Sequence, residues 1–339
     1  MTTPPFVGAQ DLTLLMTKLY VPPPWPNLVE RPRLIKRLDE GLRLGHRLTL
    51  ICAPAGFGKT TLVSNWLQQI KSRTPVAWLS LDESDNEVTR FLTYAIAALQ
   101  QIDDGLGQIV LSLLQSPQPS PIENLITLLI NDIAALPKQV VLVVDDYHVI
   151  SNSEVNNALS FLLANLPPQL HLVIASREDP MLPLPRLRIG RQVTEIRTKD
   201  LRFTEEEATH FLNRTMGLDL TPEDVAALER RTEGWAAGLQ MAALSMQDVA
   251  DTTGFITAFA GDDRYVVDYL ISEVVERQPT QIREFLLKTG FLDRLTASLC
   301  DVVTGRDDGR DSLICQFTHS LAVPATLCFQ FASAKLCFQ

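Results

Sequence analysis

The sequence contains few of the residues and patterns that mark secreted, metal-binding or membrane proteins. It has five cysteines, an odd number without Cys-x-x-Cys spacing, and five histidines without a His-Glu-x-x-His pattern. This cysteine usage argues against a disulfide framework or a zinc site and favours a reducing cytoplasm. No apolar run approaches the roughly 18–20 residues that a membrane span needs. Because the first residues, MTTPPFVGAQDL, also lack the regions of a signal peptide, we expect a cytoplasmic protein with no membrane partner.

Basic residues are too few for the chain as a whole to suit a nucleic-acid backbone. The sequence has 30 Lys and Arg residues against 40 Asp and Glu residues, which gives a net charge of −10. An acidic surface repels phosphates, so we expect no direct DNA binding by this chain. With 339 residues, of which 46% are hydrophobic, the chain has material for two or three domains with buried cores.

Up to Leu201, short apolar runs alternate with helical patterns. Near-continuous apolar strands separated by helices predict a parallel sheet that is covered on both faces. The five predicted strands are Leu48–Cys52, Val76–Leu81, Val140–Val144, Leu170–Ala175 and Val193–Ile196, and the predicted helices cover 31–43, 59–71, 88–102, 122–135 and 153–165.

After Leu201 the pattern predicts helices only. Thr204, with Glu207 three residues later, forms the pattern of a capping box that starts a helix ending near Gly217. A second helix is predicted to start at Thr221 and a third in WAAGLQMAALSMQ, and further short helices are predicted within residues 262–305.

The stretch LICAPAGFGKTTLVSNWL (50–67) has the form of a phosphate-binding loop between a strand and a helix. Glycines let backbone N–H groups converge on a phosphate, a lysine reaches the β- and γ-phosphates, and a hydroxyl holds Mg²⁺. The usual first glycine is replaced by Ala53, which suits the turn if its φ is negative. A tight turn with an incidental lysine is the alternative. The pattern predicts a nucleotide site made by Ala53, Ala55, Gly56, Phe57, Gly58, Lys59, Thr60 and Thr61.

Two later strands end in charged residues. In VVLVVDDYHVI, Asp145 and Asp146 stand where the predicted strand ends. In LVIASRED, Arg177 follows the next predicted strand. Because the carboxyl ends of parallel strands line the ligand crevice, we predict that Asp145, with Thr60, holds Mg²⁺ and that Asp146 orients a water. Arg177 would sense the γ-phosphate. The alternatives are an acidic pair that caps a turn and a surface arginine paired with Glu178 or Asp179.

The motifs together resemble the STAND class of signalling ATPases, and in particular the nucleotide-binding part of MalT-like, LuxR-type transcription regulators. The resemblance covers about residues 18–305 and rests on the stretches TKLYVPPPWPNLVERPRL, CAPAGFGKTTL, WLSLDESDNEVTRFLTYAIAAL, VVLVVDDYHVI, LVIASREDP, TEGWAAGLQMAAL and the winged-helix-like segment from DYLISEVV to DVVTG. It places Val29 and Arg31 near the adenine. It also places Ala236 there, where the wider class often has proline.

The resemblance implies five parallel strands in the order 5-1-4-3-2, followed by small helical and winged-helix domains. It suggests dividing the chain into an N-terminal segment (1–26), a P-loop domain (27–203), a helical domain (204–258), a winged-helix-like domain (259–305) and an atypical tail (306–339). The sensor repeats and helix-turn-helix of the family are not visible in the sequence.

The predicted function is that of an ATP/ADP-binding switch module of a transcription regulator. Slow Mg²⁺-dependent hydrolysis of ATP would reset the switch, and the ATP state would favour self-association or new interdomain contacts. The alternatives are a fast-turnover P-loop ATPase and a truncated scaffold that only contacts other proteins.

Overall fold

The computed structural model describes residues 13–24, 27–118, 120–247, 254–256, 280–289 and 296–308. The chain divides into two compact units. The first comprises Met1–Pro23, Ile35–Ile51 and Val63–Glu195, and the second comprises Pro24–Leu34, Cys52–Leu62 and Ile196–Gln339.

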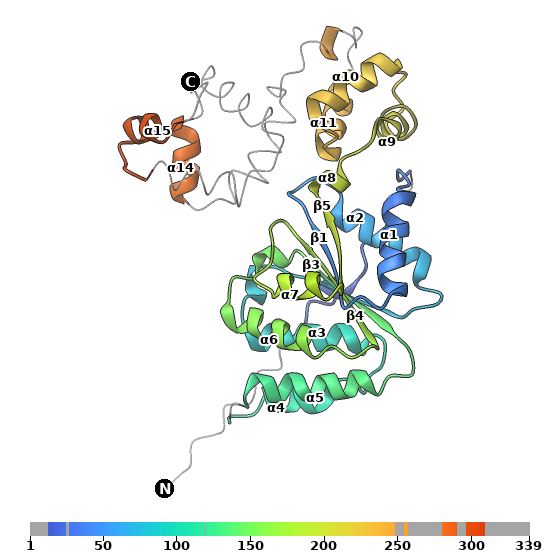
Figure 1. The fold of residues 1–339 in the computed structure, drawn as a ribbon, viewed down its shortest axis with the longest axis vertical. Helices are drawn as coiled ribbons and strands as arrows, with labels where there is room; N and C mark the ends of the chain where they lie inside the picture. Colours follow the sequence, from blue (N-terminus) through green and yellow to red (C-terminus); the bar gives the residue numbers. More distant parts are fainter. Residues whose placement is uncertain are drawn as a thin grey trace. The chain divides into compact units, whose positions relative to one another are not determined.

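A five-stranded sheet forms the centre of the first unit (Figure 1). Its strands stand in the order β2-β3-β4-β1-β5, which is the predicted order counted from the opposite edge, and β3 is parallel to both β2 and β4. Every residue of β1, β3 and β4 is buried, because these inner strands are covered on both faces. The predicted α/β fold class is therefore confirmed. The strands are β1 (Leu48–Cys52), β2 (Val76–Ser80), β3 (Val140–Asp145), β4 (Leu170–Ser176) and β5 (Val193–Arg197).

The helices that accompany the sheet lie on both sides of it, with α3, α4, α5 and α6 on one side and α1 and α2 on the other (Figure 1). All five helices predicted for this region are present, with ends that differ by at most two residues. They are α1 (Pro32–Arg43), α2 (Lys59–Ile70), α3 (Val88–Gln100), α5 (Ile122–Ala134) and α6 (Ser153–Ala164).

Two short helices of the first unit were not predicted. Helix α4 (Gln108–Leu114) follows Gly107, whose φ is +67°, and α7 (Leu184–Ile189) carries a proline in its first turn. Glycine and proline in these places are typical of loops, which hides a helix of only one or two turns. The described residues of the first unit also contain three 3₁₀ turns: η1 (Met16–Leu19), η2 (Glu83–Asp85) and η3 (Tyr147–Val149).

The second unit contains the predicted helical segment. Thr204 and Glu207 form the predicted capping box at α9 (Glu205–Thr209), which continues as the π-helical segment η4 (His210–Thr215). Thr221 accepts a hydrogen bond from the backbone of Asp224 at the start of α10, as the sequence predicts. The remaining helices of this segment are α8 (Thr198–Leu201), α10 (Pro222–Thr232) and α11 (Ala236–Met246).

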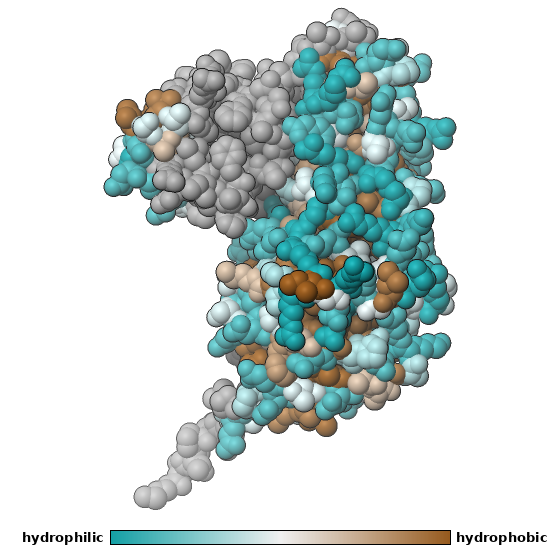
Figure 2. Space-filling view, in the orientation of Figure 1, coloured by the Kyte–Doolittle hydropathy of each residue, from teal (hydrophilic) through white to brown (hydrophobic). Residues whose placement is uncertain are grey.

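Two helices are described in the region expected to form a winged helix, α14 (Thr280–Thr289) and α15 (Ala297–Thr304). Residues 262–279 of the segment predicted to form short helices, and most of the tail, lie outside the described residues. Within the described part of the chain, no helix combines the length and the hydrophobicity needed to cross a membrane. The face in Figure 2 is largely hydrophilic, and its hydrophobic residues are scattered.

Candidate nucleotide-binding site

The P-loop, residues 53–58, connects the end of β1 to the start of α2. Gly56 and Gly58 have φ values of +76° and +75°, in the left-handed region that glycine adopts at little cost. Ala53 is not among the residues with positive φ, which meets the condition for an alanine at this position. A Cβ added to Gly58 would meet no atom within 4 Å, which shows open space beside the loop. The backbone thus has the conformation and the room that a phosphate cradle requires.

Lys59 reaches back over the loop from the first residue of α2. Its Nζ donates a hydrogen bond to the carbonyl oxygen of Pro54 at 2.9 Å, and the residue is only 7% exposed. The start of α2 adds partial positive charge, because the first N–H groups of a helix point out of its N-terminus. The loop therefore combines a nearly buried ammonium group with a helix N-terminus, an arrangement that favours anions.

The first turn of α11 holds the P-loop by two hydrogen bonds. The indole Nε1 of Trp235 donates to the carbonyl oxygen of Ala55 at 3.0 Å, and the backbone N–H of Ala237 donates to the carbonyl oxygen of Gly56 at 3.0 Å. Trp235 is fully buried, and its ring centroid lies 6.4 Å from that of Phe57. Two successive carbonyls of the P-loop are therefore fixed by residues far along the chain.

These two bonds also orient the neighbouring N–H groups. In a planar trans peptide the C=O and N–H bonds point in opposite directions. Since the carbonyls of Ala55 and Gly56 point toward α11, the N–H groups of Gly56 and Phe57 point away from it. The helical segment thus sets the direction of two donors that the motif assigns to phosphate binding.

The turn that presents Trp235 depends on Gly234. Its φ is +67°, and a Cβ at this position would lie 2.6 Å from the carbonyl oxygen of Phe203. The carbonyl of Gly234 in turn accepts a hydrogen bond from the N–H of Phe203 at 2.8 Å. Glycine is therefore required here both by backbone conformation and by close approach.

Arg31 ties the segment before α1 to the same helical segment. Its Nη2 donates to the carbonyl oxygens of Leu201 and Arg202 at 2.8 and 3.0 Å and forms an ion pair with Glu207 at 3.1 Å. Its guanidinium lies 4.9 Å from the ring centroid of Phe203. Burial lowers the pKa of Arg31, and the carboxylate of Glu207 opposes that shift. Arg31 thus stabilises the segment that leads to Trp235.

The second unit accordingly contains one connected set of predicted site residues. Arg31 contacts Phe203, Phe203 bonds to Gly234, and the adjacent Trp235 bonds to the P-loop. Two further predicted residues belong to this unit: Val29 is 6% exposed, and Ala236 is the first residue of α11.

The charged strand ends belong to the first unit. Asp145, 2% exposed, is the last residue of β3, and its Oδ1 accepts the N–H of Asp146 at 3.0 Å. Asp146 has a φ of +57°, and its side chain is 46% exposed. Val144 pairs with Ile174 in the parallel register of β3 and β4, so Arg177, just after β4, emerges at the same end of the sheet as the acidic pair.

The sequence did not predict the bond from Trp235 to the P-loop or the ion pair of Glu207 with Arg31, although it did predict the capping role of Glu207. For Trp235 the signals were the helix stop at Gly234 and the family resemblance around Ala236, and neither specifies which residue the indole contacts. The bond from Trp235 to Ala55 joins residues 180 positions apart, and no local pattern reports such a pairing.

Comparisons with known proteins agree with this architecture. The profile of an AAA ATPase domain matches residues 27–175, and that of the MalT winged helix domain matches residues 271–316. The HTH-type transcriptional regulator MalT of Cronobacter sakazakii is 36% identical over 88% of this chain and 33% of its own length. The serine/threonine-protein kinase PknK of Mycobacterium tuberculosis is 35% identical over 86% of this chain and 26% of its own length.

Among solved structures, the Walker-type ATPase PABY2304 of Pyrococcus abyssi aligns with a TM-score of 0.52 and 14% identity, covering 92% of this chain and 90% of that one. At that identity the likeness concerns the fold alone. The chain spans about a third of the MalT relative and about a quarter of PknK. The predicted resemblance is confirmed: residues 27–175 match the AAA ATPase domain model and residues 271–316 match the MalT winged helix domain model, in a chain that is similar over most of its length to MalT transcriptional regulators.

Proposed function

We propose that the chain is an ATP/ADP-binding switch module of a transcription regulator, and that it hydrolyses ATP slowly. The observation that carries the proposal is the pair of hydrogen bonds from Trp235 and Ala237 to the P-loop carbonyls. Through them, the direction of the phosphate-binding N–H groups and the position of α11 depend on each other. Similarity to proteins named transcriptional regulators supports the regulatory role.

The phosphates of the nucleotide would lie on the P-loop. We assign them to the N–H groups of Gly56, Phe57 and Gly58 and to the ammonium group of Lys59. The positive φ values of the two glycines and the open space beside Gly58 support this assignment. Thr60, which follows Lys59, completes the loop sequence with the hydroxyl that P-loops use for Mg²⁺.

The adenine would lie near Val29, Arg31 and Ala236, as the resemblance implies. The Nε of Arg31 supports this placement, since it is buried and has no hydrogen-bond partner among the described residues. A buried donor without a partner costs about 1–3 kcal/mol, so a base nitrogen that accepts this hydrogen would relieve that cost.

We assign Mg²⁺ to the Thr60 hydroxyl and the Asp145 carboxylate, because hard cations prefer such oxygen ligands. The ion would neutralise phosphate charge, and Asp146 would orient the attacking water. Arg177 would contact the γ-phosphate, so that ATP and ADP favour different arrangements of the helical segment. Self-association in the ATP state is part of the same proposal.

A single-turnover assay tests the hydrolytic step. We expect the parent to hydrolyse bound ATP more slowly than the roughly 1–10³ s⁻¹ of ordinary enzymes. The variant Asp146→Asn keeps the size of the side chain and loses a base, so its rate should fall at least about tenfold with ATP affinity within about threefold of the parent. A parent rate inside the ordinary range would favour the fast ATPase, and equal rates in the two proteins would remove Asp146 from the chemistry.

A further inference from the structure

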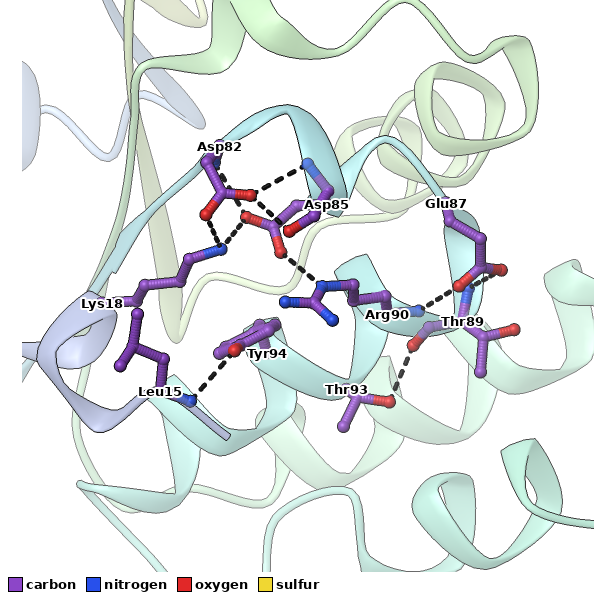
Figure 3. Close-up of polar contacts among 10 residues, drawn as sticks. Leu15, Lys18, Asp82, Asp85, Glu87, Thr89, Arg90, Thr93 and Tyr94 are labelled. Carbon is purple, nitrogen blue, oxygen red and sulfur yellow. Dashed lines mark hydrogen bonds and ion pairs between the residues drawn. The ribbon is translucent and has the colours of Figure 1, made fainter. Parts of the chain in front are cut away.

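A partly buried group of charges joins η1 to the loop that follows β2 (Figure 3). Asp85 is fully buried, and its Oδ2 lies 2.5 Å from the Nζ of Lys18, which is itself only 7% exposed. The same Nζ lies 2.7 Å from Asp82, and Arg90 of α3 donates to Oδ1 of Asp85 at 3.1 Å. The buried carboxylate of Asp85 thus meets two cations, which compensates the cost of burying its charge.

An aromatic ring completes this Lys18 cluster, defined as Lys18, Asp82, Asp85, Arg90 and Tyr94. The charged groups of Lys18 and Arg90 lie 4.8 and 5.3 Å from the ring centroid of Tyr94, and the Tyr94 hydroxyl accepts the N–H of Leu15 at 3.0 Å (Figure 3). Burial lowers the pKa of Lys18, but its hydrogen bonds to Asp82 and Asp85 outweigh burial and raise that pKa. Burial raises the pKa of Asp82, but hydrogen bonds from Lys18 and Ser84 outweigh burial and lower that pKa to about 2. The cluster is therefore a permanent anchor at neutral pH.

The loop held by this cluster, residues 81–86, contacts the end of β3 and the segment that follows it. At its start, the N–H of Leu81 donates to the carbonyl oxygen of Asp145 at 3.1 Å. At its end, Oδ1 of Asn86 accepts the N–H groups of Ser151 and Asn152 at 3.0 and 2.7 Å, and its Nδ2 donates to the Ser151 hydroxyl at 2.9 Å. A single asparagine side chain thus makes three bonds to the start of α6.

Between those two anchors lies the acidic turn, residues 145–150, which carries Asp145 and Asp146. Asp146 has a left-handed φ, which aspartate tolerates better than most residues with a Cβ, and the surrounding contacts help to hold it there. Tyr147 adds a third constraint, since its hydroxyl donates to Oδ1 of Asn156 at 2.9 Å within α6. The turn is fixed at its start, its middle and its end.

We infer that Asn86 is a positioning residue for the acidic turn, and that Lys18 acts on the same turn by holding the loop that presents Asn86. The N-terminal segment around Lys18 then contributes to hydrolysis without touching the nucleotide. The catalytic consequence rests on the proposed function; the positioning itself does not.

Amide hydrogen exchange on the nucleotide-free chain tests the positioning directly. The N–H groups of Val149 and Ile150 donate hydrogen bonds to the carbonyl oxygens of Asp146 and Tyr147 within the acidic turn. The exchange rates of these two amides therefore report whether the turn is formed. In Asn86→Ala we expect these amides to exchange at least about tenfold faster, because the side-chain oxygen that accepts the N–H groups of Ser151 and Asn152 is lost. Asn86→Asp keeps the accepting oxygen and should restore most of the protection.

Asn165→Ala is the matched control, because Asn165 is an exposed asparagine at the other end of α6 whose Nδ2 donates to Phe161. It should leave the exchange of the turn unchanged. Unchanged exchange in Asn86→Ala, or equal acceleration in the control, would overturn the inference whatever the nucleotide experiments show.

Lys18→Met tests the more distant half of the inference. It should accelerate exchange in residues 82–86 and in the acidic turn, whereas Lys138→Met, at an exposed lysine of the same unit, should affect neither. Acceleration spread evenly over the whole unit would mean that Lys18 only stabilises the fold, and it would overturn the role assigned to Lys18.

The last test compares the single-turnover rate of ATP hydrolysis with the affinity for ATP. Asn86→Ala should lower the single-turnover rate about tenfold with ATP affinity within about twofold, and Asn86→Asp should recover the rate. A faster-exchanging turn with an unchanged rate would overturn the catalytic consequence. If the parent binds no nucleotide, the proposed function fails and the exchange result still decides the positioning.

Discussion

Replacing Trp235 by phenylalanine removes the indole N–H that holds the P-loop and keeps an aromatic ring against Phe57. The bond to Ala55 is 3.0 Å long and joins a fully buried Trp235 to a half-buried Ala55, so the carbonyl would lose its protein donor. A typical hydrogen bond contributes about 0.5–1.5 kcal/mol net, and we expect the free energy of unfolding to fall by about that amount. The peptide between Ala55 and Gly56 would also be free to rotate, and binding would have to fix it again. A cost of about 1.4 kcal/mol for that step weakens ADP binding about tenfold.

Isothermal titration calorimetry with ADP measures the effect, and Trp78→Phe is the matched control. Trp78 is also buried, at 1% exposure, and its indole donates to the Ser80 hydroxyl at 2.8 Å instead of to the P-loop. Both variants lose one indole hydrogen bond, so both should be less stable than the parent. The control should keep its ADP affinity within about twofold, because its lost bond does not involve the P-loop. If Trp235→Phe bound ADP as tightly as the parent, or if both variants weakened binding equally, the coupling between α11 and the P-loop would be refuted.

Two further predictions follow from the strand ends and the core. Asp145→Ala should weaken Mg²⁺-dependent ATP binding and leave Mg²⁺-free ADP binding intact; a parallel loss of both, with the circular dichroism spectrum retained, would make Asp145 structural. Burial lowers the pKa of His171 to about 4, so its protonation favours unfolding: stability is fully present above pH 6.5 and is lost as the pH falls toward 4, by up to about 3 kcal/mol. Urea unfolding of the parent and His171→Gln between pH 7 and 4 checks this, and equal slopes in the two proteins would contradict it.

The sequence predicts the parts of the fold that local chemistry determines. Apolar runs such as Val140–Val144 are strands because both faces are buried, and Thr204 with Glu207 marks a helix start through bonds that span three residues. For Ala53 the sequence supplied only a condition, a negative φ, and the structure meets it. The order of the strands came from the family resemblance, because periodicity alone does not specify which strands are neighbours.

The contacts that shape the candidate site were beyond local patterns. Trp235 reaches Ala55 across 180 positions, and Lys18 reaches Asp85 across 67. Each pairing depends on how whole elements pack, and a lysine or tryptophan in the sequence is compatible with many partners. The short helix α7 was hidden for a different reason, since prolines in and before its first turn read as a loop.

Calorimetric titration with ATP and Mg²⁺ of the parent and Lys59→Ala tests the central claim most directly. Lys59 supplies the side-chain charge of the P-loop and is held over it by Pro54. Lys71→Ala, at an exposed lysine just after the same helix α2, is the matched control. The account predicts saturable binding by the parent and the control, and no detectable binding by Lys59→Ala with the fold retained. Equal affinity in all three proteins would contradict the assignment of the P-loop as the nucleotide site.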